Sequence, residues 1–428
     1  MVTLPNEINK YQRPFIEFKD HQFYIHILTQ DRLYDAHSFN IISQKNGIDA
    51  VAKSLSFGDG TQSDEGSIIL KLRTGHHNRD ISWMVSVKSP RLIKGIKVEI
   101  TNIPFKSLIN PFGQKIHIDD GSGYASAFPA GVYPSRILPT SGIEDQGSWL
   151  PTALAQFMLI NAPNNTILLR SEDYPPQFKR YWFFRNGEKI NLITYTEANA
   201  SEKDKVFSTP HYFLENVDSI ADGIKKHATW MKNAYSLVPF DDRGDVPKWV
   251  KNICLNLTFH CLATDGAILN TFSTIGEKLE ETAKFFDPNL THIHIVGWDG
   301  QWDYTWPNLT PDPLLGGEQG LKQLVNKAHT FGYHLDLHMN VMGLSYRNPD
   351  YDKIKHFLVH QVRDVQDRRV DWEYDWDGDE VDEKIFAYIS PDYKPWRNYL
   401  IGQILKVVNK YHIDNVHLDQ ATTIINDS

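Results

Sequence analysis

The chain has 428 residues, of which 41% are apolar and 23% are charged. This balance is typical of a folded protein with a sizeable core, and it excludes wholesale disorder, collagen-like repeats and a small disulfide scaffold. The formal net charge of −9 favours neither nucleic acid nor an anionic membrane as a partner. The length predicts two or three domains.

The first residues, Met1–Glu7, contain neither the basic segment nor the apolar segment of a secretory signal. No run approaches the ~20 apolar residues of a membrane span. The default expectation is therefore a cytoplasmic location. The two cysteines, Cys254 and Cys261, give neither a disulfide framework nor a zinc-binding spacing.

The first half of the chain reads as a series of short strands separated by turns rich in Gly, Asn and Asp. Helical periodicity is absent until about Asn216. Short strands at regular spacing predict a β-sandwich over residues 1–215. The clearest expected strands are Phe15–Thr29, Ser67–Thr74, Ile81–Lys88, Ile93–Ile103 and Leu154–Ile160.

A connecting segment follows at residues 216–247. Asn216–Tyr235 has the pattern of a helix, and Pro239–Pro247 has the Pro, Gly and Asp content of a linker. We therefore expect a helical linker between the sandwich and a third region at 248–428.

The third region alternates strands with helices, which predicts a parallel sheet. One helix opens with Thr274 and Glu277 at a capping-box spacing, and another ends at Gly332 as C-cap. The expected strands are Trp249–His260, Leu290–Trp298, Tyr333–Val341 and Ile413–Gln420, and the expected helices are Thr274–Phe286, Glu318–Phe331 and Pro395–Tyr411.

Each of these strands alternates apolar residues with His, Asp, Asn or Thr, so the sheet has one apolar face and one polar face. Parallel sheets are usually apolar on both faces. We interpret the pattern as a (β/α) barrel with a polar interior that leads to a site at the carboxyl ends of the strands. A sheet with one solvated face is the alternative.

The carboxyl end of the last expected strand carries Asp419, the sharpest catalytic candidate. A carboxylate there can attack an anomeric carbon or stabilise an oxocarbenium ion. Its alternative role is to cap a following helix. Other strand-end candidates for binding substrate are Trp298, Asp299, His338, Asn340 and His417.

The loop after the second expected strand is dense in aromatic and acidic residues. It includes Trp298, Asp299 and Trp302. Sugars present apolar C–H faces and hydroxyl rims, so stacking rings beside carboxylates suit a carbohydrate ligand. Core packing is the alternative for each tryptophan.

At the motif level the chain resembles retaining glycoside hydrolases of the endo-α-N-acetylgalactosaminidase type and, more distantly, α-galactosidases. The resemblance extends loosely from about Pro129 to Gln420. The matching motifs are Gly297–Gly317, Leu321–Gly332, His338-Met339-Asn340, Tyr388–Pro391 with Trp396 and Leu400, Asn415–Gln420, Gln156–Ile160 and Leu168–Asp173.

The resemblance implies a multidomain β plus α/β fold, in which a galactose-mutarotase-like β-sandwich at 1–215 precedes the first four strands of a (β/α)8 barrel at 248–428. It implies retaining hydrolysis of an α-linked carbohydrate, with Asp419 as nucleophile. Asp299, His338, Asn340 and His417 would bind sugar hydroxyls, and Trp298 and Trp302 would stack on sugar rings.

The expected barrel is incomplete, because a barrel of this type has eight strands and about 250 residues. In the related enzymes the general acid/base lies on a later strand, and no part of this sequence matches it. We therefore expect a truncated or split chain, with a second chain as one way to complete the barrel.

Two alternative functions remain open. The chain could be a non-catalytic carbohydrate-binding remnant, or a metal-dependent barrel hydrolase that uses His292-x-His294 and His334-x3-His338. The acidic stretch around Asp375, Asp377 and Asp379 has part of a calcium-loop pattern, although a solvated loop is its default interpretation. No cofactor or metal ligand is assigned otherwise.

Overall fold

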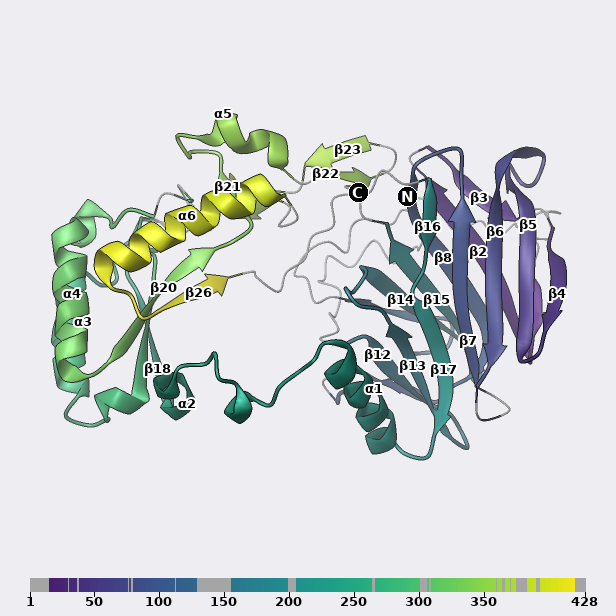
Figure 1. Ribbon diagram of the computed structural model, residues 1–428, viewed down its shortest axis with the longest axis horizontal. Helices are drawn as coiled ribbons and strands as arrows, with labels where there is room; N and C mark the ends of the chain where they lie inside the picture. The colour runs from purple at the N-terminus through teal and green to yellow at the C-terminus, as the bar shows by residue number, and fades with distance from the viewer. Residues whose placement is uncertain are drawn as a thin grey trace. The chain divides into compact units, whose positions relative to one another are not determined.

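The computed structural model describes residues 15–29, 31–36, 38–75, 77, 80–111, 113–128, 155–198, 205–263, 266–300, 306–307, 309–358, 360–363, 366–369, 371–374, 383–389 and 393–419. The chain divides into two compact units, with the main boundary between Leu237 and Val238 (Figure 1). Each unit is described by itself.

The first unit is built on a 17-stranded sheet in which the strand pairs are antiparallel. Its strands are β1 (Ile16–Phe18), β2 (His21–Thr29), β3 (Leu33–Ala36), β4 (Asn40–Gln44), β5 (Gly47–Phe57), β6 (Gln62–Thr74), β7 (Ile81–Lys88), β8 (Ile93–Pro104), β9 (Ser107–Ile109), β10 (Lys115–Ile116), β11 (Gly123–Phe128), β12 (Phe157–Asn161), β13 (Thr166–Glu172), β14 (Lys179–Asn186), β15 (Lys189–Glu197), β16 (Val206–Ser208) and β17 (His211–Val217).

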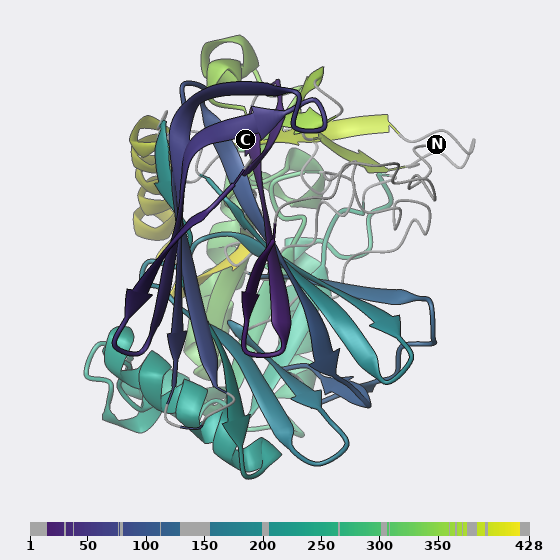
Figure 2. The same ribbon diagram turned by 90° about the vertical axis from the view of Figure 1, so that its right-hand side faces the viewer.

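Two paths of paired strands run through this sheet. One path is β11–β14–β15–β8–β2, and the other is β9–β12–β13–β17–β7–β6–β5. Strand β3 joins the two, because it pairs with both β2 and β5. Figure 2 shows the long strands of this unit side by side.

Side chains from both paths share one apolar core. Trp83 on β7 is fully buried and stacks on Tyr212 of β17, with ring centroids 5.2 Å apart. The same core contains Phe23 of β2 and Phe183 of β14. The alternation predicted from sequence is visible in β7, where every second residue from Ile81 to Val87 is buried.

Strands are present at each predicted position of the first half. The strand predicted from Ser67 begins at Gln62, and the last one begins at Phe157, since Leu154 lies outside the described residues. Phe15–Thr29 is two strands, β1 and β2, because a turn at Lys19 and Asp20 separates them and Lys19 adopts a positive φ of 54°. Among the described residues no helix precedes Ile220.

Helix α1 (Ile220–Ala234) begins later than predicted, because residues up to Val217 belong to β17. Ser219 caps the helix by accepting a hydrogen bond from the Asp222 backbone N–H at 3.1 Å. Gly223 allows close packing on β12, since a Cβ there would lie 2.7 Å from the Leu159 side chain.

The second unit is built on a four-stranded parallel sheet with the order β18–β19–β20–β26. The same unit contains a three-stranded sheet, β21–β25–β24, whereas most residues of the two-stranded sheet β22–β23 belong to the first unit. The elements after the first unit are η1 (Phe240–Asp242), α2 (Lys248–Asn252), β18 (Leu255–His260), α3 (Phe272–Thr282), η2 (Pro288–Leu290), β19 (Thr291–Val296), η3 (Pro313–Leu315), α4 (Gly317–Phe331), β20 (His334–Asn340), β21 (Gly343–Ser345), α5 (Tyr351–Ile354), η4 (Lys355–Phe357), β22 (His360–Arg363), β23 (Gln366–Arg369), β24 (Asp371–Tyr374), β25 (Glu383–Tyr388), α6 (Lys394–Tyr411) and β26 (Asn415–Asp419).

Helices α3, α4 and α6 pack on the apolar face of the parallel sheet. Ile295 and Leu337 from the sheet share a core with Leu279 of α3, Leu324 of α4 and Leu400 of α6. The strand–helix alternation and parallel sheet predicted from sequence are therefore confirmed for the described part of this unit.

Two details of the second unit differ from the prediction. The start of the expected strand Trp249–His260 lies in the short helix α2. Pro247 precedes this helix with φ −57°, which suits a helix start, and the strand begins only at Leu255. The capping box of α3 is formed by Thr271 and Thr274, three residues before the predicted pair, so the helix starts at Phe272. The C-cap at Gly332 is confirmed, with φ 95°.

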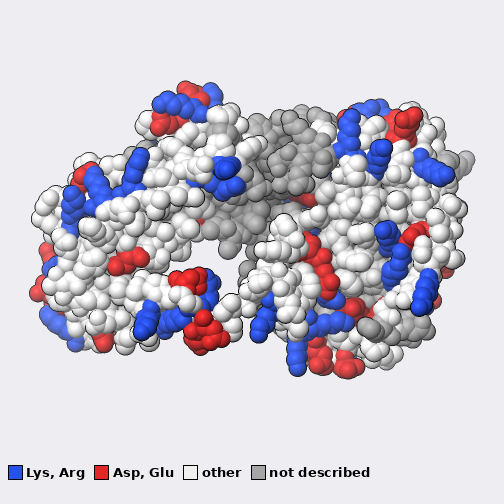
Figure 3. Space-filling model, viewed as in Figure 1, with Lys and Arg blue, Asp and Glu red and all other residues white. Residues whose placement is uncertain are grey.

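The described helices include none that is both long and apolar enough to cross a membrane. On the face shown in Figure 3, basic and acidic side chains of the described residues are interspersed, without a continuous basic surface. This distribution agrees with the net charge of −9.

Candidate functional site

The polar face of the parallel sheet carries the candidate site. The register places His294 of β19 beside Asp336 of β20, and His338 of β20 beside His417 of β26. Because successive side chains alternate between faces, these four residues lie on the face opposite the helices.

The amino end of this face is covered by Trp249 from α2. Its ring stacks on His334, with centroids 4.0 Å apart and planes at 16°. His292, the next polar residue, lies beside Asn256 of β18, with Nδ1 and Oδ1 2.7 Å apart. The histidines at this end are therefore held by an indole and an amide.

Farther along the sheet, Asp336 orients His294. Its side chain is 3% exposed, and its Oδ1 lies 2.5 Å from His294 Nδ1. A carboxylate at that nitrogen favours the tautomer with the proton on Nδ1. The Nε2 lone pair of His294 is then available to another partner.

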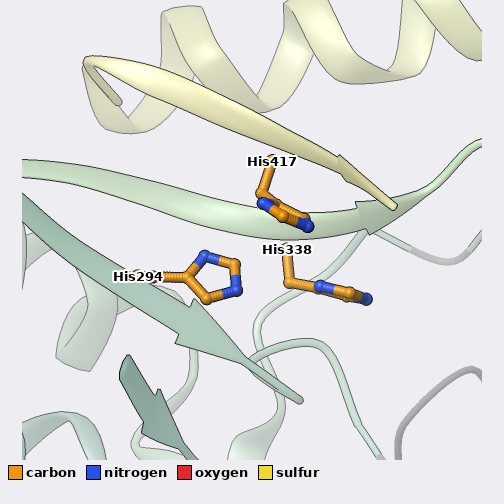
Figure 4. A group of neighbouring side chains, drawn as sticks. All are labelled: His294, His338 and His417. Atoms are coloured by element: carbon orange, nitrogen blue, oxygen red, sulfur yellow. The ribbon is translucent and has the colours of Figure 1, made fainter. Parts of the chain in front are cut away.

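Three imidazoles converge near the carboxyl end of the sheet: His294, His338 and His417 (Figure 4). One ring nitrogen from each lies within 4.8 Å of the others. Burial, together with the neighbouring histidines, lowers the pKa of His338 to about 3. His338 is therefore neutral at pH 7, while His417 is exposed.

Asp419 is the last residue of β26 and lies on the same face. Its carboxyl Oδ2 is 3.8 Å from His338 Nε2, and its side chain is 32% exposed. The register sets it beside Asn340 of β20. The structure thus brings together Asp419, His338 and His417 from the predicted residues.

Two other predicted residues have structural partners. Trp298 is fully buried in the core of the second unit, and its indole N–H donates to the His338 carbonyl at 2.9 Å. Asn340 is also fully buried, and its side-chain oxygen accepts from the N–H groups of Met342 and Gly343 at 2.8 Å each. Neither side chain presents a surface to a ligand here.

Asp299 follows β19. Just before it, the backbone at Gly297 lies very close to the backbone at Leu262. Gly297 has φ +65°, and a Cβ on it would lie 2.4 Å from the Leu262 carbonyl oxygen. The Asp299 carboxyl accepts backbone hydrogen bonds from its own N–H and from Leu309, but burial dominates and raises its pKa to about 7. Asp299 can therefore act as a hydrogen-bond donor or acceptor near neutrality.

Some predicted residues lie outside the described part of the chain. These are Trp302 and the acidic stretch with Asp375, Asp377 and Asp379.

Sequence reasoning did not foresee that His417 would join His294 and His338. It paired His294 with His292 by spacing along one strand, whereas the cluster depends on the order of neighbouring strands. It also missed Trp249, which it placed in a strand. The available signal was the shared alternation of β19, β20 and β26, which set all three histidines on one face.

No protein-family model matches the chain. A curated relative, the 1,4-alpha-glucan branching enzyme GlgB of Deinococcus radiodurans, is 28% identical over 167 residues, which are 38% of this chain and 22% of the relative. The chain thus spans about a fifth of the length of the curated relative that it matches.

Among solved structures, the alpha-N-acetylgalactosaminidase NagBb of Bifidobacterium bifidum, in complex with Gal-NHAc-DNJ, matches with a TM-score of 0.67. The match is 11% identical and covers 96% of this chain and 68% of that one. An alpha-galactosidase of Lactobacillus brevis matches with a TM-score of 0.46 and 10% identity, over 94% of this chain and 50% of that one. The resemblance to glycoside hydrolases predicted from sequence is confirmed, and at this identity it concerns the fold.

Proposed function

We propose that the chain is a glycoside hydrolase that acts on an α-linked carbohydrate by the retaining mechanism, with Asp419 as nucleophile. One observation carries the proposal: a partly exposed carboxylate ends a parallel strand on a polar face, 3.8 Å from a buried histidine. Enzymes built on parallel strand–helix units place their chemistry at the carboxyl ends of the strands. The fold likeness to NagBb supports the same reaction class.

The proposed architecture is a β-sandwich at 1–215, a helical connection at 216–247 and four (β/α) units of a barrel at 248–428. Strand β3, which links two paths of strands around one core, supports the sandwich. The parallel order β18–β19–β20–β26, with helices on one face and polar groups on the other, supports the barrel.

The environment of Asp419 suits a nucleophile. The pKa of His338 is lowered to about 3, so at neutral pH this imidazole is uncharged and does not neutralise a neighbouring carboxylate. In the proposed step, an Asp419 oxygen forms a bond to the anomeric carbon as the bond to the leaving group breaks. Water then releases the sugar with its original anomeric configuration.

Substrate hydroxyls would be bound by Asp299, His338 and His417. Asp299 has the pKa of about 7 that lets a carboxyl group both donate and accept hydrogen bonds to a hydroxyl. Asn340, whose oxygen already accepts two backbone hydrogen bonds, would instead shape the loop after β20. The proposal that Trp302 stacks on a sugar ring rests on the sequence alone.

The general acid/base of a retaining pair lies about 5–5.5 Å from the nucleophile. We propose that it comes from a strand other than the four described here, supplied by further sequence or by a second chain. A test of the nucleophile should therefore not depend on acid catalysis.

A mechanism-based α-glycosyl fluoride with a second fluorine at C5 meets this need, because fluoride leaves without protonation. We expect the full chain to acquire one glycosyl ester on the peptide that contains Asp419, detected by mass spectrometry. Asp419→Asn should abolish the label. The matched control Asp352→Asn, which changes a carboxylate that is 86% exposed on α5, should label like the wild type.

The two alternatives predict other results. A carbohydrate-binding remnant would bind the sugar, as seen by calorimetry, without forming the ester. A metal-dependent hydrolase would form no ester and would lose hydrolytic activity on treatment with a chelator. Either result would overturn the assignment of Asp419 as nucleophile.

A further inference from the structure

The histidine cluster is more than a source of sugar hydrogen bonds. His294, His338 and His417 come from three neighbouring strands, and their ring nitrogens lie within 4.8 Å of one another (Figure 4). Imidazole is a preferred ligand of Zn²⁺ and similar first-row metal ions, whereas calcium and magnesium prefer oxygen.

The geometry is close to that of a metal site. Tetrahedral zinc with Zn–N distances of about 2.0–2.1 Å holds its ligand nitrogens roughly 3.3 Å apart. The nitrogens of the cluster therefore have to approach one another by about 1–1.5 Å at most. His417 is exposed on β26, so its side chain can make most of this movement by rotation.

The surroundings supply an outer carboxylate. Asp336 lies 2.5 Å from Nδ1 of His294 and is 3% exposed. Ligating histidines commonly donate their other N–H to a carboxylate, which fixes the tautomer and the ring orientation. Here that arrangement directs the lone pair of His294 Nε2 to the cluster.

We propose that His294, His338 and His417 bind one Zn²⁺ or a similar first-row divalent ion, with Asp336 as the positioning residue of His294. Three protein ligands leave a fourth position of a tetrahedral ion open. Asp419 lies beside the cluster, since its Oδ2 is 3.8 Å from His338 Nε2.

The binding test uses the full chain, freed of metal with a chelator and titrated with Co²⁺, whose visible absorption reports four-coordinate sites. We expect one equivalent to bind and to be displaced by Zn²⁺. His417→Ala, at an exposed position, should weaken binding at least about 10-fold. His211→Ala changes an exposed histidine on β17 of the first unit and should leave the affinity unchanged.

Asp336→Asn tests the positioning residue. Loss of such an outer carboxylate typically weakens metal affinity by about 10–100-fold. The variant should still bind at high Co²⁺ concentration, with an altered spectrum, because the three ligands remain. Circular dichroism melting of each variant separates a loss of ligand from a loss of folding.

Two outcomes would overturn the proposal: no stoichiometric uptake of Co²⁺ by the wild type, or uptake that is unchanged in both His417→Ala and His294→Gln. A further consequence rests on the proposed function. Bound Zn²⁺ should draw the Asp419 carboxylate to itself and slow labelling by the glycosyl fluoride, whereas the binding data stand whether or not Asp419 is ever labelled.

Discussion

The two units treat buried polar groups in opposite ways. In the first, buried cations lie against carboxylates, as with Arg180 and Glu197 at 3.1 Å and Lys179 and Asp173 at 2.8 Å. In the second, His338 is surrounded mainly by other histidines, and burial together with these neighbours keeps it neutral. Charge pairs that compensate one another stabilise or specify a fold, whereas a buried neutral imidazole such as His338 is the form of histidine that binds metal ions.

The same contrast is visible in the sheets. Strands of the antiparallel unit place their inward side chains in one apolar core, which includes Trp83 and Phe183. The parallel sheet gives only one face to its core and leaves His417 and Asp419 at least partly exposed on the other. The candidate site therefore lies in the second unit, and four predictions test the contrast between the two units.

The largest effect is expected from one fully buried tryptophan in each unit, Trp83 in the first and Trp298 in the second. Replacing either with alanine should cost about 3–5 kcal/mol, because each leaves a large cavity. Hydrogen exchange followed by mass spectrometry should show faster exchange in β7 for Trp83→Ala and in β19 and β20 for Trp298→Ala. If either substitution speeds hydrogen exchange in both units, the two units unfold together and the contrast between them fails.

Replacing each tryptophan with phenylalanine measures the contribution of the indole hydrogen bond separately from the loss of volume. Trp298 donates a hydrogen bond to the His338 carbonyl, whereas the Trp83 indole nitrogen has no hydrogen-bond partner among the described residues. Trp298→Phe should therefore destabilise its unit more than Trp83→Phe does, by about 1 kcal/mol. Equal losses would mean that the bond to His338 contributes nothing.

Acid should destabilise both units, most strongly through one histidine in each. Burial lowers the pKa of His227 in α1 to about 4 and that of His338 to about 3. Below pH 6.5 the unfolded chain binds protons that the folded chain does not, so stability should fall as pH falls. The slope is about 1.4 kcal/mol per pH unit for each histidine, until its folded pKa is reached.

Urea unfolding at pH 7 and pH 5, followed by hydrogen exchange in each unit, measures these slopes. His227→Leu should flatten the dependence in the first unit and leave the second unchanged. Arg170 and Lys179 also lower the pKa of His227, so the effect should be larger at low salt. A first unit whose stability still falls as steeply in His227→Leu would exclude this histidine as the cause.

The helix caps should have intermediate effects of equal size in the two units. Ser219 accepts from the Asp222 N–H at 3.1 Å, and Thr271 accepts from the Thr274 N–H at 3.2 Å. Alanine at either position should cost about 1 kcal/mol, measured by chemical denaturation. Thr271→Asp should restore most of the loss, since aspartate also caps helices.

The smallest effect is expected at the exposed ion pair between α3 and α4, where Lys327 Nζ lies 2.9 Å from Glu280 Oε2. Lys327→Ala should lower the melting temperature barely measurably at low salt. At high salt the difference should vanish, because exposed pairs are screened. A large shift that survives high salt would show that Lys327 contributes through packing.

Much of the fold could be predicted from periodicity. The alternation of Ile81–Lys88 identified β7, and the aligned apolar residues with Gly332 as C-cap identified α4. Strand-end position alone identified His338, His417 and Asp419. These features are local, so a single segment of sequence contains all the information they require.

The rest depends on contacts that local patterns do not encode. Trp249 lies in a helix of only five residues, where its stacking on His334 matters more than helix propensity. The sequence around Trp298 predicts a residue that binds a sugar, whereas its side chain is fully buried in the core of the second unit. His294 and His417 lie close together because β19, β20 and β26 follow one another in the sheet. Local patterns do not reveal this order, since a long segment of chain separates β20 from β26.

Gly297 has a consequence for how substitution data on this protein should be interpreted. Its backbone has φ +65°, and any larger residue at this position, two residues before Asp299, would collide with the Leu262 carbonyl. A saturation screen should therefore find this position as intolerant as Asp419, although glycine supplies no functional group. Intolerance alone would not distinguish a residue that performs chemistry from one that only lets two stretches of main chain pass.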